Sequence, residues 1–283
     1  MKYNIVLLYS LLILLSCDNK IEKKNNSPRI KSFTKIVSPV SNSIFRDNDS
    51  IVIKVQSRSE KILRSTLVLE SDSIIFNDSI KISTNRLTRY GKHRIVIKNE
   101  LEYNKVESIS KVFYKYPLTK PNKTDYKVLK ILPHNKDSYT QGLLIHENNL
   151  FESSGQYGKS FLRKSSISDN KTINKTIIDN NYFAEGITIY DNKLYMLTWK
   201  SNKGFIYDIN SLTQIDEFSY NTEGWGLTSY QNKLLMSDGS EKIYFRDPYN
   251  FEILNILEVY DNNGKVENIN ELEIINDKLF CNI

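Results

Sequence analysis

Several residue types are scarce in this sequence, and each shortage excludes a class of structure or chemistry. Alanine occurs once in 283 residues, which argues against long helices. The three histidines, His93, His134 and His146, are not paired at the spacing of zinc ligands, so we expect no metal site. No Gly-x-Ser-x-Gly segment is present, which excludes the usual serine-hydrolase arrangement. We also expect no cofactor.

The sequence is rich instead in aromatic residues. Eighteen tyrosines and twelve phenylalanines supply much of the 40% apolar fraction, and aromatic residues favour strands over helices. A chain of this length can hold one large or two ordinary domains. We therefore predict an all-β protein.

The first residues resemble a bacterial lipoprotein signal. After the positively charged start Met1-Lys2, the apolar stretch Ile5–Leu15 is too short to span a bilayer as a stable anchor. The segment LLSC then places a small residue directly before Cys17. We predict a cleaved signal peptide over residues 1–16, lipid attachment at Cys17 and a membrane-anchored location in the cell envelope. The alternative is an ordinary secretory peptide with an incidental cysteine.

Cys281 is the only other cysteine in the chain. Lipid attachment at Cys17 would leave Cys281 without a partner for an intramolecular disulfide. Its apolar surroundings predict a small, buried side chain.

The first half of the chain reads as a tether followed by short strands. Residues 17–28 are polar and charged, as is typical of a flexible segment. Residues 29–118 predict a small immunoglobulin-like β-sandwich that serves as a spacer or adaptor. Its candidate strands are Ser50–Ser57, Ser65–Ser71, His93–Asn99 and Lys111–Tyr116. Residues 119–125 predict a linker, and a second domain is expected over residues 126–283.

The distribution of charge also divides the chain near residue 126. Residues 17–125 contain 22 Lys and Arg against 12 Asp and Glu, whereas residues 126–283 contain 16 against 21. The basic part could favour anionic headgroups next to the lipid anchor, or could simply be a solvated surface. Nucleic acid is a poor partner for an exported protein whose larger domain is acidic.

Four segments of the second domain align without gaps and form an internal repeat. They are LLIHENNLFESSG from Leu143, ITIYDNKLYMLTW from Ile187, LTSYQNKLLMSDG from Leu227 and LEIINDKLFCNI from Leu272. Each reads as a strand, a polar turn and a second strand. A period of 40 to 45 residues built from hairpins is typical of a β-propeller with one four-stranded blade per repeat. A parallel solenoid is the less favoured alternative, because hairpins imply antiparallel pairing.

The residues just before each repeat should meet around the propeller axis. These positions are TQG, AEG, GWG and INE, so Gln141, Glu185, Trp225 and Asn270 are predicted neighbours. The first three precede a glycine, which permits close backbone approach or a positive φ. If these positions only formed turns at the blade junctions, we would expect interchangeable Asp, Ser and Asn there. They hold instead a carboxylate, two amides and an indole, which indicates that this ring of four residues has a function.

These stretches resemble the glutaminyl-peptide cyclotransferases of the plant and bacterial type. The resemblance rests on YTQGLLIHENNLFESSGQYGKSFLR, FAEGITIYDNKLYMLTW, YNTEGWGLTSYQNKLLMSDGSEKIYFRDPYNF and VENINELEIINDKLFCNI, and runs from about Tyr139 to the last residue. It implies a five-bladed β-propeller. It also implies metal-independent conversion of the N-terminal glutamine of peptides or proteins to pyroglutamate, with release of ammonia.

The resemblance also implies roles for individual residues. Glu185 matches the position of the catalytic acid and would act as general base and then general acid. Gln141 and Asn270 would orient the substrate or stabilise the oxyanion. Trp199 and Trp225 would form the aromatic walls of the pocket and exclude water.

Four further acidic positions are open to two interpretations. Glu152 and Glu223 also match positions of the family motifs, and each could bind the substrate ammonium or raise the pKa of Glu185, or could serve only the scaffold. Asp238, in SDGS, and Asp247, before a proline, are better explained as turn residues.

About three repeats and the start of a fourth are present, whereas the resemblance implies five blades. We expect either that the sequence is a piece of a longer protein or that the propeller has an exposed sheet edge. Two functions remain open: a lipid-anchored glutaminyl cyclase, and a propeller that only binds and uses the sandwich as an adaptor.

Overall fold

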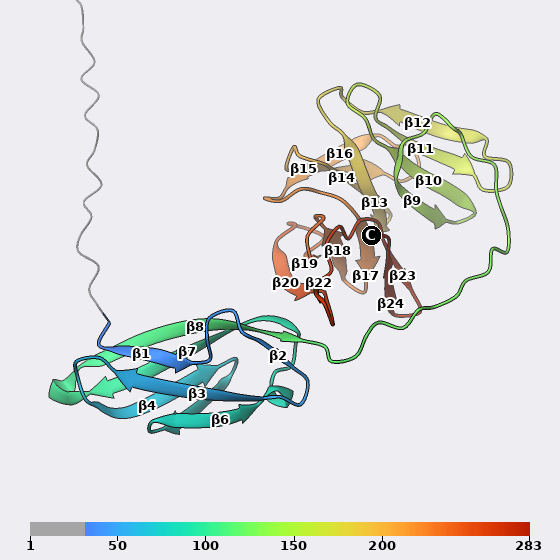
Figure 1. Ribbon diagram of the computed structural model, residues 1–283. Helices are drawn as coiled ribbons and strands as arrows, with labels where there is room; N and C mark the ends of the chain where they lie inside the picture. The colour runs from blue at the N-terminus through green and yellow to red at the C-terminus, as the bar shows by residue number, and fades with distance from the viewer. Residues whose placement is uncertain (1–31) are drawn as a thin grey trace, which may run out of the picture.

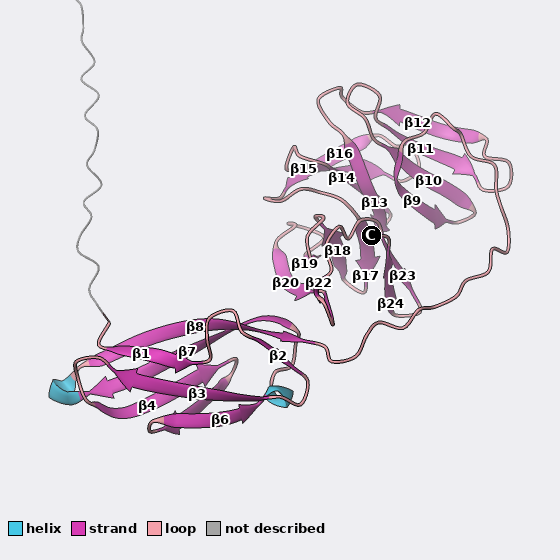
Figure 2. Cartoon of the chain, viewed as in Figure 1, coloured by secondary structure: helices cyan, strands magenta, loops and turns pink. Residues whose placement is uncertain are grey.

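The computed structural model describes residues 32–283, and across this range the protein consists of strands with two short 3-10 helices (Figure 2). The all-β prediction is confirmed. The predicted signal peptide, Cys17 and the tether over residues 17–28 lie outside the described residues. Within the described range, no helix is long and apolar enough to cross a membrane.

The first eight strands form two sheets (Figure 1). Strands β1, β3 and β6 form one sheet, and the other has the order β2-β8-β7-β4-β5. The bounds are β1 Thr34–Ser38, β2 Ile44–Arg46, β3 Ser50–Ser57, β4 Ile62–Leu69, β5 Asp72–Phe76, β6 Ser79–Ser83, β7 Gly91–Leu101 and β8 Val106–Tyr116; the 3-10 helices are η1 Thr84–Arg86 and η2 Glu102–Asn104.

One apolar core lies between these two sheets. In β3, Ile51, Ile53 and Val55 are buried, while the intervening residues are exposed. This alternation places every second side chain on the face that meets the other sheet. There, Ile97 of β7 and Phe113 of β8 belong to the same buried cluster. The two sheets therefore pack as the layers of a β-sandwich.

The remaining strands form three four-stranded antiparallel sheets and a final hairpin (Figure 1). Their bounds are β9 Thr140–His146, β10 Asn149–Ser154, β11 Phe161–Ser166, β12 Thr172–Ile177, β13 Ala184–Tyr190, β14 Lys193–Thr198, β15 Lys203–Asp208, β16 Gln214–Ser219, β17 Leu227–Tyr230, β18 Lys233–Ser237, β19 Lys242–Arg246, β20 Ile253–Glu258, β23 Leu272–Ile275 and β24 Lys278–Cys281, with a small ribbon of β21 Tyr260–Asp261 and β22 Gly264–Lys265.

Each of the four aligned repeats folds as an antiparallel hairpin with a two-residue turn. In the first, second and fourth repeats both central residues have positive φ, as in Asp191 and Asn192. Such turns match the right-handed twist of the paired strands and favour Asn and Asp. The antiparallel pairing excludes the parallel solenoid.

The inner strands β9, β13, β17 and β23 lie side by side around the centre of this half of the molecule (Figure 1). Apolar layers fill the space between successive sheets. One layer contains Phe151, Ile187 and Met196, and the next contains Leu197, Leu227 and Tyr244. The result is a β-propeller-like arrangement in which each repeat contributes its first strand to the centre.

The sandwich contacts the end of β20 and the ribbon of β21 and β22 that follows it. The rings of Tyr116 and Tyr260 are 5.4 Å apart. Arg46 Nη1 donates a 2.9 Å hydrogen bond to the carbonyl of Asn262. The backbone N–H of Lys92 donates to Glu258 at 3.2 Å.

Residues 117–139, which include the predicted linker over residues 119–125, form no strand, and β9 begins at Thr140. One sequence expectation differs from the structure. Cys281 was expected to be buried, but it is exposed. It lies on β24, and within residues 32–283 no further strand pairs with the outer edge of that strand.

Candidate active site

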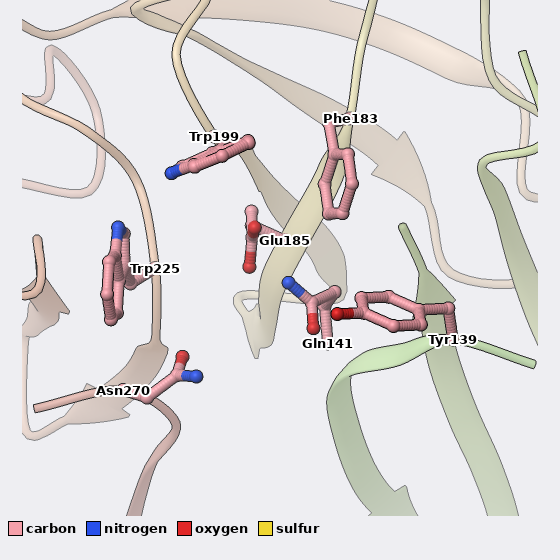
Figure 3. A pocket seen from close by; sticks show the side chains of 7 residues that line it. All are labelled: Tyr139, Gln141, Phe183, Glu185, Trp199, Trp225 and Asn270. Atoms are coloured by element: carbon pink, nitrogen blue, oxygen red, sulfur yellow. The ribbon is translucent and has the colours of Figure 1, made fainter. Parts of the chain in front are cut away.

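A pocket of about 260 Å³ opens where the four repeats meet (Figure 3). Glu185 lies at its centre, at the start of β13, with Gln141 of β9 beside it. Trp225 and Asn270 come from the segments just before β17 and β23. The residues that line the pocket are Tyr139, Gln141, Phe183, Glu185, Trp199, Trp225 and Asn270. Five of these seven residues were expected from the sequence: Gln141, Glu185, Trp199, Trp225 and Asn270. They meet in the pocket although up to 129 positions separate them in the sequence, from Gln141 to Asn270 (270 − 141).

Glu185 is almost completely buried, with 4% of its surface exposed. Burial raises its pKa from the ordinary 4.5 to about 8, and the negative charge of Glu223 acts in the same direction. The Gln141 amide lowers the pKa and only partly offsets these effects. The carboxyl of Glu185 is therefore mostly protonated at neutral pH and can both accept and donate a proton near pH 8.

Aromatic rings enclose the carboxyl on several sides (Figure 3). Phe183 meets Trp199 edge-on with ring centres 5.5 Å apart, and meets Tyr139 in the same way at 6.1 Å. Trp225 faces the group from the opposite side. These rings supply an apolar wall, and the burial that they cause is what raises the pKa of Glu185.

Glu223 fixes the two indoles without lining the pocket itself. Its Oε2 atom accepts a hydrogen bond from Trp199 Nε1 at 2.8 Å and another from Trp225 Nε1 at 3.0 Å. Its other oxygen lies 3.9 Å from the ammonium of Lys200. One carboxylate therefore holds both walls of the pocket in place.

Replacing Glu223 with glutamine should lower the pKa of Glu185, because it removes a nearby negative charge while an amide oxygen still accepts from the indoles. We expect the protonation midpoint of Glu185, followed by infrared difference spectroscopy over a pH titration, to move to lower pH. Glu223→Ala, which removes the acceptor as well, should weaken binding of a ligand in the pocket about tenfold. An unmoved midpoint in Glu223→Gln would show that this charge does not reach Glu185.

Glu152, one of the predicted substrate contacts, does not line the pocket. Its fully buried carboxylate accepts hydrogen bonds from Thr140 at 2.6 Å and from His134 at 2.9 Å. Arg163 donates two more, at 2.6 Å and 3.1 Å. Burial alone would raise the pKa of Glu152, but these donors and the Arg163 charge hold it below the ordinary value. The carboxylate is saturated by the scaffold, so the structure does not support a role in substrate binding.

Tyr139 and Phe183 line the pocket but were missed in the sequence. Each stands two residues before a predicted pocket residue, in YTQG and FAEG, and Glu223 has the same position relative to Trp225. Alternate residues of an extended chain share a face. This spacing was the signal that could have found Tyr139 and Phe183.

Glu271, beside Asn270, is a half-buried residue whose Oε2 atom is buried near the centre. Its Oε2 atom has no hydrogen-bond partner among the described residues. Burial raises its pKa to about 9, and the charges of Glu273 and Glu185 add to the effect. A carboxyl whose pKa is higher in the folded protein stabilises the fold while it is protonated, and that stability is lost as pH rises through the folded pKa.

Glu271→Gln should therefore make stability less dependent on pH. The free energy of unfolding of the wild type should fall from about pH 5 to about pH 9, and the variant should lose less over that range by more than about 1 kcal/mol. Urea unfolding followed by tryptophan fluorescence measures this. Parallel curves for the two proteins would contradict the raised pKa.

The two remaining acidic positions serve turns. Asp238 accepts from the backbone of Ser240 and from the hydroxyl of Tyr244, and Asp247 accepts from the backbone of Tyr249. Within residues 32–283, no group of three or more His, Cys, Asp or Glu residues is placed to hold a metal ion.

The model of the glutamine cyclotransferase family matches residues 103–283. The chain belongs to the glutamine cyclotransferase family. The sequence resemblance is thereby confirmed, and the match covers all the pocket-lining residues.

Two relatives of this family member illustrate the similarity. A glutaminyl-peptide cyclotransferase of Arabidopsis thaliana is 37% identical over 161 residues, covering 56% of this chain and 50% of the relative. The crystal structure of Myxococcus xanthus glutaminyl cyclase matches with a TM-score of 0.52 and 31% identity, over 56% of this chain and 66% of that one. The chain spans about half the length of the curated relative that it matches.

Proposed function

We propose that this glutamine cyclotransferase family member converts the N-terminal glutamine of peptides or proteins to pyroglutamate and releases ammonia, without a metal ion. The observation that carries the proposal is the buried Glu185 carboxyl, whose pKa is raised to about 8 in a pocket of aromatic rings and amides. A pocket used only for binding would have no need of a proton carrier poised near physiological pH.

The reaction forms one bond and breaks another. The substrate α-amino nitrogen attacks the carbon of its own side-chain amide, whose oxygen becomes an oxyanion. Glu185, as carboxylate, takes a proton from the attacking nitrogen. The resulting carboxylic acid donates this proton to the amide nitrogen, the bond from carbon to that nitrogen breaks, and ammonia leaves as the lactam closes.

The acidities of substrate and protein are matched for this transfer. An N-terminal ammonium has a pKa of about 7.7–8.0, close to the value of about 8 for Glu185. A proton moves between two groups of equal pKa at little cost in free energy, and near pH 8 neutral amine and carboxylate are both well populated.

The other pocket residues position the substrate. The Gln141 and Asn270 side chains flank Glu185 and offer amide N–H donors to the developing oxyanion and acceptors to the amine (Figure 3). The Trp199 and Trp225 rings would hold the glutamine side chain folded back toward its own amine, which favours ring closure over an extended conformation.

We further propose a five-bladed propeller for the whole protein, an immunoglobulin-like sandwich as spacer, and attachment of the mature chain to an envelope membrane through Cys17. The sequence supports each of these expectations.

Radiolabelled palmitate should enter the wild type in a bacterial host and not Cys17→Ser. Equal labelling would refute the anchor.

The activity is tested by incubating the full chain with a synthetic peptide that begins with glutamine. We expect release of ammonia and a blocked N-terminus. A peptide that begins with asparagine is the matched control, because its closure would require a strained four-membered ring. Peptide binding measured by calorimetry without ammonia release would favour the binding-only function.

A further inference from the structure

The pocket residues are joined beneath the pocket by a continuous series of hydrogen bonds between neighbouring sheets. We call this series the inter-sheet belt. It comprises the backbone of Gly142, Glu185, Gly186, Trp225, Gly226 and Asn270 together with the hydroxyls of Ser153 and Ser237.

The first junction of the belt joins Gln141 to Glu185 through a serine. The backbone N–H of Gly142 donates to Ser153 Oγ at 2.9 Å, and the same hydroxyl donates to the carbonyl of Glu185 at 2.5 Å. Ser153 is fully buried on β10. One hydroxyl therefore fixes the strand that carries Gln141 against the strand that carries Glu185.

The second junction is direct. The backbone N–H of Gly186 donates to the carbonyl of Trp225 at 2.7 Å. A Cβ atom on Gly186 would collide with this carbonyl, so the sheets can approach this closely only with glycine. The aligned position that holds Ser153 in the first repeat is Leu197 here.

The third junction repeats the first. The backbone N–H of Gly226 donates to Ser237 Oγ at 2.7 Å, and Ser237 Oγ donates to the carbonyl of Asn270 at 2.7 Å. Ser237 is also fully buried. In the fourth repeat the aligned residue is Asn282, whose side-chain oxygen accepts from the backbone of Glu271 at 2.8 Å.

We propose that Ser153 is a positioning residue for the proposed cyclisation, because its single hydroxyl sets the placement of the Glu185 carboxyl relative to the Gln141 amide. This role rests on the proposed function of the pocket. Ser237 performs the equivalent task for Trp225 and Asn270. Neither serine touches the pocket, and both act through the backbone of the residues that do.

The physical reason is that a carboxyl moving a proton between two nitrogens tolerates little displacement. A shift of about 1 Å in a reacting group can cost about a hundredfold in rate. Without the hydroxyl, the Gly142 N–H and the Glu185 carbonyl would both lose a buried partner. The two strands could then separate and admit water beside the carboxyl.

Ser153→Ala is the test, with Ser165→Ala as matched control. Ser165 is an equally buried serine of the adjacent strand β11 that has no part in the belt. We expect Ser153→Ala to lower kcat by about ten- to a hundredfold with a smaller change in KM. Ser165→Ala should keep kcat within about threefold of wild type. Equal losses of kcat in the two variants would overturn the proposal.

A second measurement needs no turnover. The protonation midpoint of Glu185, followed by infrared difference spectroscopy, should fall toward the ordinary carboxyl range in Ser153→Ala, because water would reach the carboxyl. It should stay near the wild-type value in Ser165→Ala, the matched control outside the belt. An unchanged midpoint in Ser153→Ala would contradict the positioning role. Absence of turnover in the wild type would instead contradict the proposed function.

Discussion

Replacing Glu185 with glutamine should lower kcat for the conversion of a glutamine-initiated peptide by about 10²- to 10⁴-fold. The amide of glutamine has nearly the same shape as the carboxyl but cannot take a proton from the substrate amine or deliver one to the departing nitrogen. Ammonia release under saturating peptide measures the loss.

The folded state of this variant must be intact for the result to count. Because the raised pKa of Glu185 shows that its charge is costly, the neutral variant should unfold at the same temperature as the wild type or higher, and more so at alkaline pH. Peptide binding should persist, since the aromatic walls are unchanged. Turnover equal to that of the wild type would remove Glu185 from the mechanism.

Replacing Arg163 with methionine should lower the free energy of unfolding by about 3–5 kcal/mol. Arg163 is 5% exposed and donates two hydrogen bonds to the fully buried Glu152. Its removal leaves a buried carboxylate without its cation. The free-energy cost of this unpaired charge is larger than the net stabilisation that the ion pair gives the folded protein. Urea unfolding followed by fluorescence reports on this half of the molecule, because both tryptophans of the chain, Trp199 and Trp225, lie there.

An exposed pair provides the matched control. Lys203 and Glu217 approach to 2.7 Å, but their side chains are 38% and 52% exposed. Lys203→Met should change the free energy of unfolding by no more than about 1 kcal/mol. The double variant Glu152→Met with Arg163→Met should recover much of the loss. Similar effects from Arg163→Met and Lys203→Met would show that burial does not set the cost.

The internal repeat was enough to predict four of the seven residues that line the pocket. Once four hairpins align at a period near 40 to 45 residues, rotation about one axis brings Gln141, Glu185, Trp225 and Asn270 together. Hydrophobic alternation also gave β3 with its observed bounds, Ser50–Ser57. These features are local or periodic, so they can be recognised in a single sequence.

Partners across strands were not predictable in the same way. Glu152 meets Arg163 because the two residues are paired in the register of β10 and β11, and meets His134 because a strandless segment crosses the sheet there. The serine hydroxyls of the belt depend on contacts between sheets. Such pairings follow from register and packing, which a sequence of residue types does not specify.

Cys281 shows a further limit of the sequence. An apolar run predicts burial only when another element covers it, and within residues 32–283 the outer edge of β24 has no such cover. The predicted signal peptide and the lipidated Cys17 stay predictions, since they lie outside the described residues.

Infrared spectroscopy of the Glu185 carboxyl is the decisive test of its proposed role as proton carrier. The difference between wild type and Glu185→Gln, recorded over a pH titration, isolates the carbonyl band of this one protonated carboxyl. We predict that the band disappears with a midpoint near 8, because burial among the rings and the charge of Glu223 raise the pKa. A midpoint near 4.5, the value of an ordinary glutamate, would contradict it.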